Sequence, residues 1–189
     1  MEIPSLDQLM EERERRRNRH GFRRIILGIF FLLASAAALA VLVTMLWLPA
    51  FRISGESMSP ALQAGDVVVT AKADSPAPGD VVSLYHDNIL LVKRIIACSG
   101  DWVDIKENGD VLVDGVQLDE PYAIGRDLVE YDSNKFPLQV DEGCFFLLGD
   151  NRAESVDSRS DLIGCVAAGR IEGRVLFRIW PLNRIGRVQ

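Results

Sequence analysis

The sequence is poor in histidine and cysteine, and both scarcities restrict the chemistry open to it. Its three cysteines, Cys98, Cys144 and Cys165, are far apart and form no C-x-x-C motif. No zinc site is therefore predicted, and we expect neither a metal nor a cofactor. The spacing is compatible with one disulfide and a free thiol, or with three small apolar side chains in the core.

An overall basic charge is also lacking. The 189 residues carry a formal net charge of −6, which argues against a general nucleic-acid-binding protein. Arginine is concentrated at the N-terminus, where residues 1–24 hold seven arginines and five acidic residues. We interpret this segment as a charged cytoplasmic tail.

Residues 25–48 contain no charged side chain. A helix of this length, at about 1.5 Å per residue, crosses a hydrocarbon core of about 30 Å, and Trp47 suits the membrane interface. Ala34-Ser35-Ala36 resembles a signal-peptide cleavage site, but the long apolar segment favours a transmembrane helix. Because seven arginines precede the segment and only Arg52 lies in residues 49–68, the positive-inside rule predicts a cytoplasmic N-terminus.

Residues 49–189 show no long helical period and are rich in short runs of strand-forming residues. Gly or Asp punctuates most of these runs, as Asn108-Gly109 does between two of them. The pattern predicts a mostly β domain, a small barrel or sandwich. The predicted strands include residues 67–69, 81–82, 90–92, 102–105, 111–113 and 145–148.

Ser57 lies in a turn-prone stretch, residues 54–62, a few residues beyond the apolar segment. A serine hydroxyl is a weak nucleophile and needs a nearby base. His20 lies on the other side of the predicted membrane helix. His86 lies in a polar turn, residues 85–88, and is expected to be solvent-exposed, so a Ser-His-Asp triad through His86 stays a minor alternative.

Lysine is the other base that serves a serine nucleophile. Of the lysines, Lys93 lies in an otherwise apolar run, residues 90–97. Apolar surroundings remove hydration from the ammonium form, so they lower the pKa of a lysine. Strand alternation predicts that only one of Lys93 and Arg94 faces inward. The pattern alone leaves open whether Lys93 instead points into water.

Residues 149–159, Gly-Asp-Asn-Arg-Ala-Glu-Ser-Val-Asp-Ser-Arg, are dense in hydrogen-bonding groups. The segment is compatible with a loop that satisfies its own polar groups. It is equally compatible with a supporting role, in which a serine orients a lysine amine while Arg and Asp lock the loop by charge-assisted hydrogen bonds.

Together these motifs resemble bacterial type I signal peptidase (leader peptidase, family S26), a membrane-anchored Ser–Lys serine endopeptidase. The single apparent span is similar to the compact, Gram-positive type. The matching segments follow one another in the family's order: Ser57-Met58-Ser59-Pro60, Gly79-Asp80-Val81-Val82, Lys93-Arg94 before Gly100-Asp101, residues 149–159 and Ile179-Trp180-Pro181.

The resemblance implies that Ser57 is the nucleophile and Lys93 its general base. It implies that Ser155 positions the Lys93 amine, and that Asp157, with Arg152 and Arg159, holds the loop. The Ser57 backbone N–H would contribute to the oxyanion hole. Gly55 stands where some members carry a further serine donor. Flanking residues are expected to line substrate pockets or else belong to ordinary core: Ile53, Met58, Leu62 and Val92.

The family fold implied is a coiled antiparallel β-sheet, barrel-like, behind one transmembrane helix. The expected divisions are a tail (1–24), a membrane helix (25–48) and an extracytoplasmic peptidase domain (49–189). Expected partners are the lipid bilayer and secretory precursors with small residues at P1 and P3, the first and third positions before the scissile bond. We expect a monomer in the plasma membrane that binds no nucleic acid.

Two other functions compete with signal-peptide removal. The first is a catalytically silent, membrane-tethered β module that binds exported peptides without cleaving them. The second is a self-cleaving Ser–Lys regulator of the repressor-protease type. Such regulators generally carry a DNA-binding domain, and residues 1–49 offer only the tail and the apolar segment.

Overall fold

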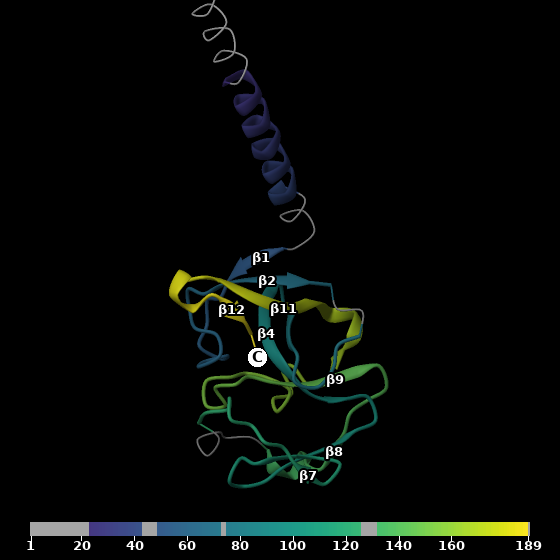
Figure 1. Ribbon diagram of the computed structural model, residues 1–189. Helices are drawn as coiled ribbons and strands as arrows, with labels where there is room; N and C mark the ends of the chain where they lie inside the picture. Colours follow the sequence, from purple (N-terminus) through teal and green to yellow (C-terminus); the bar gives the residue numbers. More distant parts are fainter. Residues whose placement is uncertain (1–22, 43–48, 73–74, 126–131, 189) are drawn as a thin grey trace, which may run out of the picture. The chain divides into compact units, whose positions relative to one another are not determined.

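The structure is a computed structural model that describes residues 23–42, 49–72, 75–125 and 132–188 (Figure 1). The predicted tail, apart from Arg23 and Arg24, and the segment 43–48 with Trp47 lie outside the described residues. The chain divides into two compact units, Met1–Trp47 and Leu48–Gln189, and each is described by itself.

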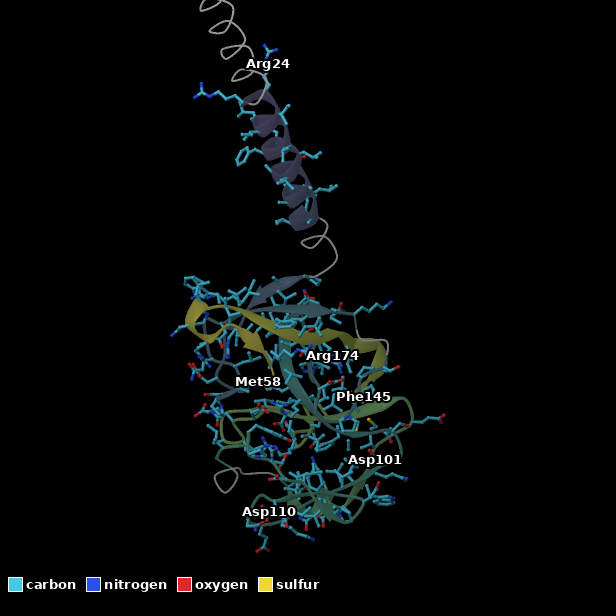
Figure 2. All side chains as sticks on the ribbon, viewed as in Figure 1. Arg24, Met58, Asp101, Asp110, Phe145 and Arg174 are labelled. Carbon is cyan, nitrogen blue, oxygen red and sulfur yellow. The ribbon has the colours of Figure 1, made fainter. Side chains whose placement is uncertain are left out.

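The first unit contributes a helix, Arg23–Leu42, which carries no charged side chain after Arg23 and Arg24. Its side chains project on all sides and are exposed, with Arg24 near one end (Figure 2). At about 1.5 Å per residue such a helix is about 30 Å long, the thickness of a hydrocarbon core. Among the described residues it is the one helix long and apolar enough to cross a membrane.

The second unit is built almost entirely of short strands and single 3-10 turns. Every strand pairing in it is antiparallel. Its elements are β1 Ala50–Arg52, β2 Val67–Ala71, β3 Val81–His86, β4 Ile89–Cys98, β5 Trp102–Ile105, β6 Val111–Val113, β7 Val116–Gln117, η2 Ser133–Lys135, β8 Leu138–Gln139, β9 Cys144–Leu148, β10 Val166–Ala167, η3 Ala168–Arg170, β11 Ile171–Trp180, η4 Leu182–Arg184 and β12 Gly186–Arg187.

The strands form two sheets. The large sheet has the order β1-β2-β11-β3-β4-β9-β10, with β12 added to β11, and the small sheet has the order β7-β6-β5-β8. Within this unit β1 and β2 lie at one end and β7 and β8 at the other (Figure 1). The mostly β, antiparallel prediction is confirmed. The strands of the described residues form no closed barrel, so the barrel-like detail is not confirmed.

Both faces of the large sheet are packed. Val82 and Ile95 belong to one buried apolar cluster, while Val81 and Val92 belong to another on the opposite face. A third cluster, which includes Ile96 of β4, joins the large sheet to the small one. Strand β4 therefore runs through the centre of the core, and six consecutive residues of it are buried.

This double covering corrects one prediction. Lys93 and Arg94 point to opposite faces of β4, yet each is only 2% exposed, because apolar clusters pack against both faces of the strand. The three cysteines are half-buried free thiols, so no disulfide is formed.

Candidate active site

Ser57 lies in a tight turn that a distant loop holds in place. The Leu62 N–H donates to the Met58 carbonyl (2.8 Å), and the Asn151 N–H donates to the Ser57 carbonyl (3.0 Å). Met58 anchors the turn because its side chain is buried in the core at 1% exposure. Within the described chain the Ser57 backbone N–H donates no hydrogen bond and its hydroxyl has no partner. Both groups are therefore available to a ligand.

Lys93 lies in the middle of β4, opposite Val82 of β3. Burial of its amine lowers its pKa from 10.5 to about 8, with the Arg159 charge adding to the effect and the Asp157 and Asp150 carboxylates opposing it. At pH 7 this change raises the neutral, proton-accepting fraction about 300-fold. Lys93 has no hydrogen bond or ion pair within the described residues.

Two cavities, each of about 400 Å³, meet at Ser57. Ser57 and Leu91 line both, whereas Lys93 lines only one. We call the cavity with Lys93 the lysine cavity and the other the turn cavity, because residues 51–55, 57 and 58 around the Ser57 turn line it. The structure thus brings Ser57 and Lys93 to one cavity, although no hydrogen bond joins them in the part of the chain that is described.

The loop of residues 149–159 is locked by buried ion pairs. Arg159 donates through Nε and Nη2 to both carboxylate oxygens of Asp157, at 2.7 and 2.8 Å. Asp157 also accepts the Gly149 N–H at 3.0 Å. Charge-assisted, bidentate bonds of this kind are short and geometrically specific. They hold the loop against the strand β9 that precedes it.

Arg152 is locked by a different partner, Glu120, which lies 32 positions earlier in the chain. Both side chains are buried, at 2% and 0% exposure, and Arg152 Nε also donates to the Gly149 carbonyl at 3.0 Å. Sequence reasoning missed Glu120, because it lies in a stretch, residues 120–139, with few strand signals. No local sequence pattern indicates that Arg152 would pair with an acidic residue so far away in the sequence.

Ser155 Oγ is buried and has no hydrogen-bond partner among the residues that the structure describes. A buried hydroxyl without a partner is uncommon and often marks a functional site. The Ser155 side chain lies against the Cα of Gly149, as does the Ser57 carbonyl oxygen. Gly149 thus brings the predicted supporting serine and the predicted nucleophile close to the same point.

The His86 side chain is less exposed to solvent than the sequence predicts. It is the last residue of β3, and the turn consists only of Asp87 and Asn88, whose φ values are 48° and 65°. The side chain is 23% exposed and lines the lysine cavity. Its Nδ1 lies 2.7 Å from Arg170 Nη2, so the imidazole is half-buried because an arginine packs on it.

The predicted substrate-pocket residues divide into two groups. Ile53, Met58 and Val92 line the turn cavity, together with Gly55. Leu62 is absent from both cavity walls and is fully buried in the core cluster of Ile53 and Met58. A Cβ added at Gly55 would meet nothing within 4 Å, so the position of the missing serine hydroxyl is open space.

Arg94 and Asp150 form a further buried pair that sequence reasoning did not assign. Arg94 Nε and Nη2 donate to the Asp150 carboxylate at 2.8 and 2.7 Å, and its guanidinium lies 4.0 Å from the centre of the Tyr122 ring. This pair ties β4 to the start of the loop 149–159. No group of three or more His, Cys, Asp or Glu that could hold a metal ion occurs among the described residues.

The geometry suits nucleophilic attack on a carbonyl. A serine with a free hydroxyl shares a cavity with a buried lysine whose pKa is lowered. The neutral amine can accept the serine proton, and the free Ser57 N–H can stabilise an oxyanion.

Comparison with known proteins finds similarity to signal peptidases over most of the chain. A family model described as "Signal peptidase, peptidase S26" matches residues 25–180. The signal peptidase I of Bacillus licheniformis is 32% identical over 165 residues, which cover 79% of this chain and 86% of that protein. Thylakoidal processing peptidase 1 of Arabidopsis thaliana is 30% identical over 93% of this chain, but the match spans only 56% of that protein. A solved signal peptidase I from Enterococcus faecalis is 24% identical, with a TM-score of 0.46, and the match covers 55% of this chain and 98% of that one.

Proposed function

The chain belongs to the signal peptidase family S26, and from this premise we propose that it removes N-terminal signal peptides from secretory precursors with Ser57 as nucleophile and Lys93 as general base. One observation carries the assignment of the two residues. Ser57 lines the same cavity as Lys93, a lysine 2% exposed whose pKa is lowered to about 8 by burial.

The proposed reaction has two halves. Lys93 Nζ accepts the Ser57 hydroxyl proton as Oγ bonds to the scissile carbonyl carbon. The Lys93 ammonium then gives this proton to the peptide nitrogen, the C–N bond breaks, and an acyl-Ser57 ester and a free amine remain. A water molecule next gives a proton to Lys93 and adds its hydroxide to the ester carbonyl. The C–Oγ bond breaks, and Ser57 regains the proton from Lys93.

The surrounding groups have supporting roles in this proposal. The free backbone N–H of Ser57 donates to the developing oxyanion. Ser155, whose buried hydroxyl lacks a partner, positions the Lys93 amine. Asp157 and Arg152 keep the loop that carries Ser155 in one conformation through their ion pairs with Arg159 and Glu120. Rigid support of this kind is what a catalytic geometry requires.

The substrate would enter as an extended segment whose small P1 and P3 side chains fill the turn cavity beside Ile53, Met58 and Val92. The helix Arg23–Leu42 would anchor the enzyme in the plasma membrane. By the positive-inside rule, the arginines that precede and begin it would put the N-terminus in the cytoplasm and the peptidase unit outside, where cleavage sites emerge.

Two single substitutions test the proposal. Ser57→Ala and Lys93→Ala are each expected to lower kcat/KM for a precursor with alanine at P1 and P3 at least about a thousandfold, as removal of a nucleophile or its base does. The assay is gel or mass-spectrometric detection of the processed protein. Thermal unfolding of each variant shows whether the fold is retained.

Ser75→Ala and Lys106→Ala are matched controls, since Ser75 is exposed in a loop and the Lys106 side chain is 54% exposed. Both should process the precursor normally. Near-normal cleavage by folded Ser57→Ala or Lys93→Ala would refute the dyad. Binding of the precursor without cleavage by the unsubstituted protein would instead support the silent peptide-binding module.

A further inference from the structure

Ser57 lies between two cavities of similar size but different chemistry. The turn cavity is lined by residues 51–55, 57 and 58 and by residues 88–92. The lysine cavity has Lys93 in its wall, together with residues from the β3–β4 turn and from segments 154–156 and 162–163. A peptide bound across Ser57 therefore has one side in each.

The proton transfer to the leaving nitrogen indicates which cavity holds the residue after the scissile bond. The leaving nitrogen belongs to P1′, the first residue after the scissile bond, and this nitrogen must receive a proton before it departs. The donor must lie within hydrogen-bonding reach, about 3 Å. In the proposed reaction that donor is Lys93, which lines only the lysine cavity.

We propose that the lysine cavity is the subsite for the P1′ residue of the mature protein, and that Glu154 and Asp87 on its rim make it select neutral or basic residues over acidic ones. The inference rests on the proposed peptidase function and extends it to the other side of the scissile bond. The product that leaves through this cavity is an amine.

The two carboxylates at the rim outnumber the one lysine in the cavity wall, so the charges fit a cationic or neutral occupant. Glu154 is exposed at the cavity wall and makes no hydrogen bond or ion pair through its side chain in the described chain. The Asp87 side chain is 87% exposed and lies 3.5 Å from His86. Two carboxylates at the rim disfavour a third carboxylate on the substrate and attract the newly formed terminal ammonium.

Two further observations indicate that this cavity takes a ligand. Lys93 is 2% exposed, has no partner within the described chain, and lines the cavity. Val156 and Leu162 line the same cavity while remaining 54% and 72% exposed. Their apolar surface offers contacts to the aliphatic part of a P1′ side chain, since burial of such surface favours binding.

The test uses three precursor peptides that are identical except at P1′, which is Lys, Gln or Glu. The full-length protein is expected to process them in the order Lys, Gln, Glu. Glu154→Lys reverses a charge at the rim and should lower the ratio of kcat/KM for the Lys and Glu peptides about fivefold or more, the size expected for exposed charge pairs. Replacing the P3 residue of the peptides should change kcat/KM by the same factor in Glu154→Lys and in the unsubstituted protein.

Glu107→Lys is the matched control, because it changes the net charge by the same amount as Glu154→Lys. Glu107 is exposed in the turn between β5 and β6. The Glu107→Lys substitution should leave the ratio unchanged. The inference would be overturned if Glu154→Lys and Glu107→Lys changed the ratio equally, or if neither changed it. It would also be overturned if the effect of Glu154→Lys depended on the P3 residue of the peptide. Ser57→Ala separates the two proposals: if cleavage needs Ser57 but ignores Glu154, only the P1′ assignment fails.

Discussion

Gly149→Ala is expected to separate two groups that the candidate active site needs close together. A Cβ at this position would lie 2.5 Å from the Ser57 carbonyl oxygen and 2.5 Å from Ser155 Cβ, and still nearer to Ser155 Oγ. Gly149 has no positive φ, so alanine is compatible with its backbone. The effect of the substitution is therefore steric.

The size of the effect follows from the space required. Ordinary contacts of a Cβ are about 3.4 Å or longer, so each neighbour must retreat by about 1 Å. The Ser155 side chain can rotate away, but the Ser57 carbonyl is backbone and accepts the Asn151 N–H. A displacement of about 1 Å at a catalytic group costs about 100-fold in rate. Overpacking of this kind costs about 1–3 kcal/mol of stability.

The assay is kcat/KM for precursor cleavage, measured with thermal unfolding of the same preparation. Gly169→Ala is the control, because a Cβ there would meet nothing within 4 Å. We expect Gly149→Ala to remain folded at the assay temperature and to lose about 100-fold in kcat/KM. If the folded variant keeps cleavage within about threefold of the parent, the spacing between Ser57 and Ser155 is not critical and the reasoning is wrong.

Two further predictions concern buried charges. Because neutral Lys93 is the proposed base and its pKa is about 8, kcat/KM should rise about tenfold per pH unit below pH 8 and level off above it. If the His86→Asn variant shows the same rise in kcat/KM below pH 8, the rise belongs to Lys93 and not to His86. A flat profile of kcat/KM from pH 6 to 9 would contradict the assignment of Lys93 as the base. Glu120→Gln leaves the buried Arg152 without its charge partner, so urea unfolding should show a loss of about 3–5 kcal/mol. The exposed Glu142→Gln should change stability by less than about 0.5 kcal/mol, and an equally small loss in Glu120→Gln would show that the buried pair is not stabilising.

The strands with continuous apolar runs could be predicted from the sequence. β6 and β9 coincide with apolar runs that end at Asp114 and Gly149, and β2 and β5 begin directly after Gly65-Asp66 and Gly100-Asp101. The long strand β11, Ile171–Trp180, was missed, although it pairs with both β2 and β3. Only two of its ten residues are buried, and Arg174 is exposed, while the Arg178 side chain is 14% exposed and pairs with Asp66. A half-exposed strand gives a weak local signal, and its partners lie about 100 positions away in the chain.

The candidate active site likewise combines residues that a short stretch of sequence indicates with pairs that only the fold brings together. Ser57 and Lys93 could be proposed from residue scarcity and apolar context, since both are visible in a short window. The partner of Arg152 could not, because the pair with Glu120 depends on how the segment after β7 returns to the loop. His86 was expected in water, and only the fold shows that Arg170 covers it from 84 positions away.

The environment of Lys93 links stability to the proposed chemistry. Its low pKa is caused chiefly by burial, and burial arises because clusters from two sides enclose β4. Asp157 and Arg159 act on the amine with opposite signs, the carboxylate more strongly, so the arginine offsets part of the effect of the carboxylate that it holds. A lone carboxylate beside Lys93 would instead favour the ammonium form and work against a general base. The arginine that locks the loop therefore also protects the low pKa that the proposed reaction requires.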